Sequence, residues 1–314
     1  MLKVGMAGIG GISGAHIPAW ESMADTELIA LCDIRPECLE KYPDKHLYTD
    51  FEEMLDAEQL DILDICLPTY LHADFAVRAM ERGIHVICEK PVSLNAEDVE
   101  RLYGTARRNN VKFMVAQVLR FWPEYMLLKE IYDSGKYGRL LAGSMSRLGS
   151  IPKWSWDGWM RDEKRSGLVP YDLHIHDLDF MVYAFGNPAG TQLHRSRRPE
   201  QDYLNVVYEY PDFFITTEAS WYAASYPFRA GFRFQFEKAI LAYENGQCTL
   251  YEENGEVTNL TKEAEGDTGD INLPKSDAYA KEIRYFTDCV LEDRIPERVK
   301  PEELYQVIQI LNSL

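Results

Sequence analysis

The sequence lacks the features that mark membrane-spanning, secreted and nucleic-acid-binding proteins. No stretch reaches about 18 consecutive apolar residues, so we expect no transmembrane helix. Met1 leads directly into a strand-like segment, without the basic stretch and cleavage site of a secretory signal. Positive charge is scarce: 33 Lys and Arg stand against 51 Asp and Glu, a net charge of −18. This excess of acid argues against nucleic acid and anionic membranes as partners, since both would be repelled.

The cysteine pattern also argues against one class of site. The six cysteines include no C-x-x-C pair, which argues against a structural zinc site. We interpret them as reduced thiols of a cytoplasmic protein. Internal repeats and low-complexity segments are also lacking. With 314 residues, 46% of them hydrophobic, the chain is long enough for two ordinary domains.

Residues 1–120 alternate short hydrophobic strands with helical stretches. Strands separated by helices predict a parallel, doubly wound sheet, so we assign 1–120 to an α/β domain of the Rossmann type. The expected strands lie near 2–7, 27–32, 61–66, 84–88 and 111–117.

Residues 121–314 have a different pattern, in which aromatic and β-branched strands follow one another through short turns such as Asn245-Gly246. Asn-Gly between two strands favours a hairpin, so we expect a mainly antiparallel sheet with a few helices. The polar stretch Glu253–Asp270 is expected to form an exposed hairpin and loop. The expected strands lie near 203–210, 213–221, 228–236, 239–243 and 247–251, and the helices near 172–185, 276–292 and 301–313.

A glycine-rich turn follows the first strand and precedes a helix. Gly8 permits the tight turn, and Gly10 lets backbone N–H groups approach the phosphates of a dinucleotide at the helix N-terminus. Gly11 and Ile12 complete the turn, but Ser13 stands where the G-x-G-x-x-G pattern has its third glycine. The order of strand, turn and helix therefore predicts a nicotinamide cofactor, NAD or NADP.

The choice between these two cofactors depends on the end of the second strand. Asp33 lies about 20 residues beyond the glycines, where an acid would bind the ribose hydroxyls and favour NAD. Arg35 could instead stack on adenine or bind a 2′-phosphate, so the preference stays open.

Two further strands end in polar loops, Leu67-Pro68-Thr69 with His72 and then Glu89-Lys90-Pro91. Ligands of an open parallel sheet bind beyond the carboxyl ends of its strands. Lys90 falls at such an end and can meet a bound substrate, and the following proline fixes the loop that presents it.

A second chemical motif lies in the segment Gly167–Asp179. If a helix begins near Asp172, then Asp172 and His176 are neighbours at i and i+4. A carboxylate beside an imidazole suits a general base that works near neutral pH. The alternative is a capping Asp and an ordinary core or surface His. A metal site from His174 and His176 is disfavoured, because two positions apart on a helix they point to nearly opposite sides.

Trp154, Trp156 and Trp159 lie just upstream among charged residues. Aromatic rings with nearby polar groups suit stacking on a sugar or polyol, and ordinary packing or a subunit contact is the competing interpretation.

Five stretches together resemble the Gfo/Idh/MocA oxidoreductases, the family of glucose–fructose oxidoreductase and inositol dehydrogenase. They occur in the family's order and spacing across most of the chain. They are Ala7–Ile12, Leu67–His72, Cys88–Pro91, Leu119–Pro123 and Tyr171–Asp179. The resemblance implies a Rossmann domain, then an α/β domain whose large, open, mostly antiparallel sheet is used in oligomerisation, as a dimer or tetramer.

The resemblance also implies a catalytic trio of Lys90, Asp172 and His176, with no metal. His174 departs from the family pattern, because a glycine is usual at that position, and its imidazole near the pocket would narrow the pocket or contact the substrate.

The expected activity is dehydrogenation of a sugar, polyol or related hydroxy compound. A non-catalytic dinucleotide-binding regulator and a nicotinamide-dependent hydrolase or eliminase are the alternatives. The expected cofactor ligands are Gly8, Gly10, Gly11, Ile12, Asp33, Arg35, Leu67, Pro68, Thr69, His72, Glu89 and Lys90, and the expected substrate ligands are Lys90, Arg120, Trp159, Asp172 and His176.

Overall fold

The computed structural model describes residues 1–262 and 276–314, which divide into two units. The first unit joins Met1–Val118 to residues 276–308, and the second joins residues 119–262 to Gln309–Leu314. The first segment ends close to the boundary expected at 120. Residues 276–308, which we had assigned to the second domain, belong with the first unit instead.

The first unit contains a six-stranded parallel sheet in the order β3-β2-β1-β4-β5-β6. This confirms the doubly wound architecture. The sequence did not reveal β3, a three-residue edge strand with little hydrophobic signal. The order reverses between β1 and β4, which is where open sheets of this type bind ligands. The strands are β1 (Leu2–Ala7), β2 (Thr26–Cys32), β3 (His46–Tyr48), β4 (Ile62–Ile65), β5 (His85–Glu89) and β6 (Phe113–Ala116).

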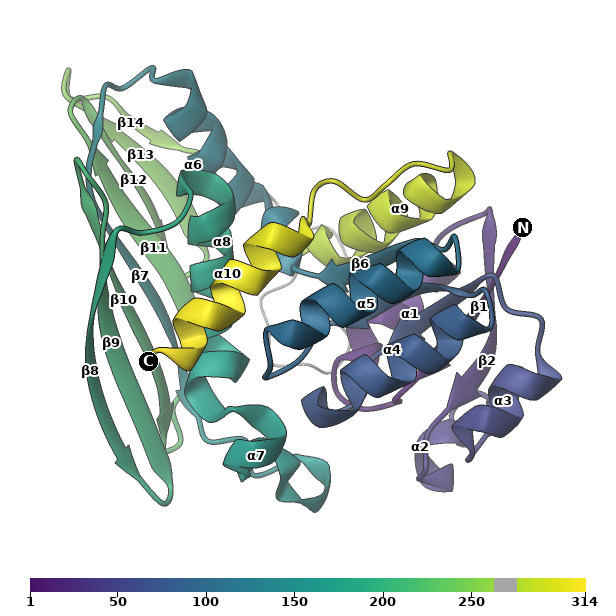
Figure 1. Cartoon of the computed structure of the whole chain (residues 1–314). Coiled ribbons are helices and arrows are strands. Elements are labelled where there is room, and N and C mark those ends of the chain that lie inside the picture. The colour runs from purple at the N-terminus through teal and green to yellow at the C-terminus, as the bar shows by residue number, and fades with distance from the viewer. Residues whose placement is uncertain (263–275) are drawn as a thin grey trace. The chain divides into compact units, whose positions relative to one another are not determined.

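Helices α4 and α5 lie side by side on one face of this sheet (Figure 1). Helix α9 packs against α1 and β5, and its Arg284 binds Asp25 at 2.7 Å. These contacts explain why this late segment groups with the first unit: an amphipathic pattern predicts a helix without saying which sheet it covers. The helices are α1 (Ser13–Glu21), α2 (Pro36–Leu39), α3 (Phe51–Ala57), α4 (His72–Glu81), α5 (Glu97–Arg108), α9 (Ala278–Leu291) and α10 (Pro301–Asn312), the last of which runs on into the second unit.

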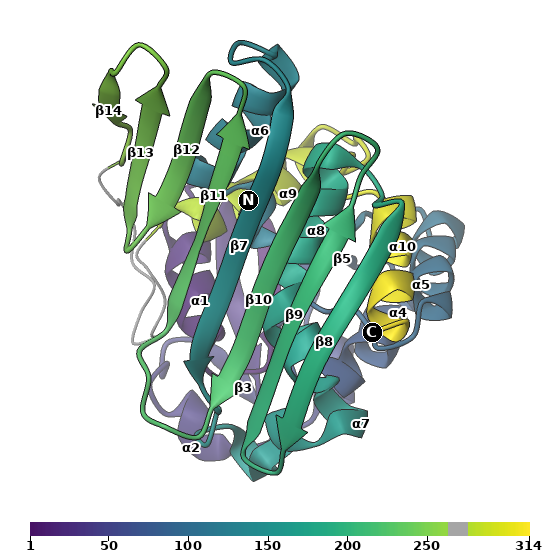
Figure 2. The ribbon, with the colours of Figure 1, turned by 90° about the vertical axis from the view of Figure 1, so that its left-hand side faces the viewer.

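The second unit contains an eight-stranded sheet in the order β14-β13-β12-β11-β7-β10-β9-β8 (Figure 2). Only the central pair β7 and β10 is parallel among the described strands, so the expected mostly antiparallel sheet is confirmed. The strands are β7 (Leu140–Ser150), β8 (Gly190–Arg198), β9 (Gln201–Glu209), β10 (Phe214–Tyr222), β11 (Arg229–Phe236), β12 (Ala239–Glu244), β13 (Gln247–Glu252) and β14 (Val257–Asn259).

Strand β7 was missed in the sequence because its inward positions are not uniformly hydrophobic. At Gly143 a Cβ atom would lie 2.5 Å from the Phe234 ring, so glycine there makes room for an aromatic side chain of β11. Strand β8 was missed because it is a charged edge strand, a composition that blocks sheet-to-sheet pairing.

Helices α6 (Pro123–Ser134) and α8 (Ile175–Phe185) lie behind the sheet in Figure 2, and Tyr125 of α6 packs edge-on against Phe180 and Phe232. A short helix, α7 (Glu163–Ser166), precedes α8. Strand β14 forms the hairpin expected after Glu253, whereas the later part of that stretch lies outside the described residues. Of the helices described, none combines the length and the hydrophobicity needed to cross a membrane.

Candidate active site

The glycine turn between β1 and α1 fits a dinucleotide phosphate. Gly8 has φ +93°, and a Cβ there would lie 2.6 Å from the carbonyl carbon of Cys66, so only glycine is tolerated. A Cβ at Gly10 would meet nothing within 4 Å. Helix α1 begins without a side-chain cap, and the N–H groups of Gly14 and Ala15 donate to the carbonyls of Gly11 and Ile12. The positive end of the helix dipole still favours an anion at this turn.

Asp33 closes this turn from the end of β2. Its Oδ2 accepts a hydrogen bond from the backbone N–H of Ile9 at 2.8 Å, and Arg35 donates to both carboxylate oxygens at 2.9 Å. Burial raises the pKa of Asp33, but the hydrogen bonds from Arg35 and Ile9 outweigh it and bring the pKa below its ordinary value. Asp33 is therefore a fixed negative charge beside the glycine turn.

His72 connects the loops that follow β4 and β5. Its Nδ1 lies 2.7 Å from the carbonyl oxygen of Pro91, and its Nε2 lies 2.6 Å from that of Leu67. The side chain is buried, and so is Thr69, whereas Leu67 and Pro68 are half-buried. His72 thus links the two loops through their backbone carbonyls, and its expected contact with the cofactor stays a prediction.

Glu89 and Lys90 also take different positions. Lys90 is partly exposed at the end of β5, but Glu89 turns into the interior. The Glu89 Oε2 accepts a hydrogen bond from the backbone N–H of Lys90 at 3.0 Å, and its Oε1 lies 3.1 Å from His16 Nε2. The Glu89 carboxylate therefore holds the backbone of Lys90, and its expected contact with the cofactor stays a prediction.

A buried cluster that was not predicted from the sequence joins His16, Asp64 and Trp20. The Asp64 Oδ2 accepts hydrogen bonds from His16 Nδ1 at 2.8 Å and from Trp20 Nε1 at 2.7 Å. A signal was present, because Asp64 interrupts the hydrophobic strand β4, and a buried carboxylate needs partners.

This cluster could be read as a metal site, since His16, Asp64 and Cys66 place one donor atom each within 4.8 Å of one another. Burial, however, raises the pKa of the Cys66 thiol to about 12, which disfavours the thiolate that binds metals. Both nitrogens of His16 are engaged by carboxylates. An ion-pair network accounts for the cluster without a metal.

In the second unit, a π-helical turn at Pro170–His174 precedes α8. Single π turns of this kind are frequent at functional sites. Asp172 and His176 are each partly exposed, while most of their neighbours from 168 to 182 are buried. The two side chains predicted to work together are therefore the accessible polar positions of an otherwise buried segment.

His174 is fully buried, and its Nε2 lies 2.7 Å from the hydroxyl of Tyr208. Burial, with Arg147 nearby, lowers the pKa of His174 to about 3, so the ring is neutral. His174 therefore lies in the core of the second unit, whereas the sequence predicted its imidazole near the substrate pocket.

Arg120 also lies in the core of the second unit. Its guanidinium donates to both oxygens of Asp179, at 2.8 and 2.7 Å, and stacks over the ring of Tyr183. It is fully buried, and its expected contact with the substrate stays a prediction. Trp159 is half-buried in a 3₁₀ segment, Trp156–Arg161, and remains accessible.

Two family models match this chain. The first, described as an oxidoreductase family with an NAD-binding Rossmann fold, matches residues 2–117. The second, the GFO/IDH/MocA C-terminal domain, matches residues 125–242. The chain belongs to the Gfo/Idh/MocA oxidoreductase family. Its first unit is accordingly an NAD-binding Rossmann domain.

Individual relatives agree with this membership. D-apiose dehydrogenase of Paraburkholderia graminis is 29% identical over 189 residues, 59% of this chain and 50% of the relative. The 2,7-anhydro-N-acetylneuraminate hydratase of Mediterraneibacter gnavus is 28% identical over 138 residues, 44% of this chain and 37% of the relative. The chain spans about half the length of the curated relatives it matches. A solved levoglucosan dehydrogenase with NADH and levoglucosan has the same fold, with TM-score 0.85, 18% identity, and 99% and 95% of the two chains covered.

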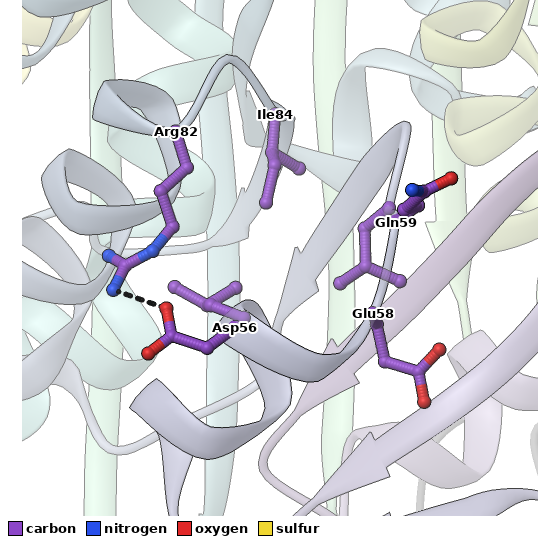
Figure 3. A pocket seen from close by; sticks show the side chains of 7 residues that line it. Asp56, Glu58, Gln59, Arg82 and Ile84 are labelled. Atoms are coloured by element: carbon purple, nitrogen blue, oxygen red, sulfur yellow. Dashed lines mark hydrogen bonds and ion pairs between the residues drawn. The ribbon is translucent and has the colours of Figure 1, made fainter.

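A surface pocket of this Gfo/Idh/MocA protein lies elsewhere on the Rossmann unit (Figure 3). Glu58 and Gln59 precede β4, and Arg82 and Ile84 precede β5, with Arg82 bound to Asp56 at 3.1 Å. The pocket is therefore at the amino ends of these strands, opposite the end where open sheets bind nucleotides. It is separate from the proposed cofactor site.

Proposed function

We propose that the protein is an NAD(P)-dependent dehydrogenase acting on a CH–OH group of a sugar, polyol or related hydroxy compound. The observation that carries this proposal is the accessibility of Asp172, in the π-helical turn, and of His176, in α8, within an otherwise buried segment of a family whose first domain binds NAD. A general base beside a carboxylate is what removal of a hydroxyl proton requires. The similarity to D-apiose dehydrogenase supports a carbohydrate substrate.

The bound nicotinamide supplies the acceptor or donor of the hydride. In the oxidative direction, His176 accepts the proton of the substrate hydroxyl. Lys90 donates a hydrogen bond to the same oxygen and stabilises the negative charge that develops there. Asp172 orients the imidazole and the substrate. Reduction uses the same groups in reverse, with His176 returning the proton.

For the cofactor we favour NAD over NADP. Asp33 is a charged carboxylate at the position that binds ribose hydroxyls in such domains, and it would repel a 2′-phosphate. Arg35 is held by this carboxylate and offsets part of its charge.

A nicotinamide-dependent hydratase or eliminase is the second candidate, and similarity to a 2,7-anhydro-N-acetylneuraminate hydratase favours keeping it. Such an enzyme would regenerate its cofactor in each turnover, so purified protein would convert substrate without net NADH formation. A non-catalytic regulator is less favoured, because Lys90, Asp172 and His176 are all present.

The test is turnover of a panel of sugars and polyols by wild type, Lys90→Met and His176→Asn, followed by NADH absorbance. Each variant should lose about 10²-fold or more in kcat while NADH affinity is unchanged. Lys112→Met and His46→Asn repeat the same chemical changes at an ion pair with Asp293 and at one with Glu58, and should behave as wild type. Full activity of Lys90→Met would contradict the proposal.

We also infer a homo-oligomer, dimer or tetramer, formed through the open face of the eight-stranded sheet. The face toward the viewer in Figure 2 carries none of this unit's described helices. Phe214 and Tyr251 are exposed and alternate along their strands with buried Ile215 and Leu250, so they belong to the face away from the helices, and Val257 pairs with Tyr251. Light scattering should report more than one chain per particle, and Phe214→Asp should lower that mass.

A cytoplasmic location is supported by the thiols, because all six cysteines are free and five of them are buried.

A further inference from the structure

Glu89 is held at both ends of its carboxylate. Oε2 accepts from the backbone N–H of Lys90 at 3.0 Å, and Oε1 lies 3.1 Å from His16 Nε2. The other nitrogen of the His16 ring lies 2.8 Å from Asp64 Oδ2. These contacts link Asp64 of β4, through His16 and Glu89, to Lys90, which is the residue proposed to stabilise the substrate oxygen.

The partners of His16 determine its protonation. Carboxylates accept hydrogen bonds and do not donate them, so an imidazole between Asp64 and Glu89 satisfies both only when both of its nitrogens carry protons. Burial lowers the pKa of His16, but the neighbouring Asp64 outweighs it and holds that pKa well above its usual value. His16 is therefore a buried cation shared by two carboxylates.

We propose that His16 is a positioning residue that fixes Lys90 through Glu89. It rests on the proposed dehydrogenase function, in which the ammonium of Lys90 must be placed on a developing charge. Misplacing a catalytic group by about 1 Å can cost about 10²-fold in rate. Because His16 lies on the helix that follows the glycine turn, it also ties the cofactor-binding element to the strand that carries Lys90.

The surroundings favour this role over simple core filling. Asp64 and Cys66 face His16 from the end of β4, Glu89 faces it from β5, and the Tyr279 ring of α9 lies 5.8 Å away. Placing a cation and two carboxylates in a buried site carries a desolvation cost that a hydrophobic side chain would avoid. The arrangement instead gives Glu89 a single orientation, and through it the backbone of Lys90.

The test compares His16→Asn with a matched control, His85→Asn, in protein saturated with NADH. His85 lies at the start of β5, where its Nδ1 accepts from the backbone N–H of Lys112 at 2.8 Å, away from the network. The first measurement is amide hydrogen exchange of Lys90 by NMR in [15N]lysine-labelled protein, with the peak assigned through Lys90→Arg. The second is kcat, KM and the NADH dissociation constant.

We expect exchange at Lys90 to accelerate at least about 10-fold in His16→Asn, because Glu89 loses its second anchor. Values of kcat should fall by about 10- to 100-fold, while KM and NADH affinity change by less than about threefold. His85→Asn should leave all of these at wild-type values. Equal behaviour of the two variants overturns the proposal, and so does faster exchange with unchanged kcat.

A third measurement keeps the proposal testable if His16→Asn does not fold. In wild-type protein labelled with [15N]histidine, both ring nitrogens of His16 should still be protonated at a pH at which an ordinary histidine is neutral. A neutral ring at that pH overturns the proposal. Neither NMR measurement requires turnover, so failure to find any substrate would count against the proposed dehydrogenase and leave the coupling between His16 and Lys90 to be decided by these spectra.

Discussion

The carboxylate of Asp33 accepts a hydrogen bond from the backbone N–H of Ile9 at 2.8 Å, joining the end of β2 to the glycine turn after β1. The contact spans the two strand ends on which a dinucleotide's ribose and phosphates would rest. The same carboxylate is bound by Arg35. Asp33 therefore has two roles that can be separated by removing its charge while keeping its shape.

Asp33→Asn should shift the cofactor preference toward NADPH. The amide oxygen can still accept from Ile9, but the charge that repels a 2′-phosphate and binds ribose hydroxyls is lost. Because a hydrogen bond to a charged group contributes about 1.5–3 kcal/mol, NADH affinity should fall about 10-fold or more. Fluorescence titration of both cofactors measures the ratio. Asp44→Asn, at an exposed surface position, serves as control, and an unchanged ratio in Asp33→Asn would refute the assignment.

Alanine at the two glycines should separate folding from cofactor binding. Gly8→Ala places a Cβ 2.6 Å from the Cys66 backbone and should unfold the domain at markedly lower denaturant concentration. Gly10→Ala meets no protein atom within 4 Å, so stability should be unchanged. Its methyl group would instead occupy the space above the turn and should weaken NADH binding by about 10-fold or more. Unchanged NADH affinity in Gly10→Ala would mean that the turn is only structural.

Breaking the buried pair of Arg120 and Asp179 should destabilise the fold strongly. Asp179→Asn removes one charge of a fully buried ion pair, a change that typically costs about 3–5 kcal/mol. The exposed pair of Lys129 and Asp133 is the comparison, and Asp133→Asn should cost no more than about 0.5 kcal/mol. Urea unfolding measures both. If both variants lost a similar free energy of unfolding, burial of the ion pair would not be the cause of the loss in Asp179→Asn.

Much of the fold could be read from the sequence because hydrophobic periodicity reports local structure directly. Strands β1, β2, β4, β5 and β6 were expected within about two residues of their observed bounds. The glycine turn was recognised because tight turns demand a particular residue. What periodicity could not report was long-range pairing. Strand β7 lies at the centre of its sheet between β10 and β11, yet its glycines and serines give it a weak signal.

In the site, the directions of individual side chains could likewise not be predicted from the sequence. Sequence order places Glu89, Lys90 and His72 at strand ends, but it does not say which side chain faces the ligand and which faces inward. Glu89 and His72 are buried and hold the loops, while Lys90 is partly exposed. Their partners, such as His16, lie far away along the chain and were recognisable only through a charged residue in a hydrophobic strand.

His174 should make the protein sensitive to acid. Its pKa is lowered to about 3 in the fold by burial and by Arg147, whereas the unfolded chain has the ordinary value near 6.5. Between these two values the unfolded state binds one more proton than the folded state, so the free energy of unfolding falls as pH falls. No contribution arises above pH 6.5, and at pH 5 the loss amounts to about 2 kcal/mol.

The prediction is tested by the difference between wild type and His174→Gln, because other buried histidines contribute equally to both. Urea unfolding at pH 7 and pH 5 should show that wild type loses about 2 kcal/mol more than the variant over this interval. His194→Gln, on the exposed edge strand β8, should keep the wild-type pH dependence. If His174→Gln loses as much stability as wild type on acidification, then His174 is not neutral in the core, and the contact with Tyr208 must be formed by a charged ring.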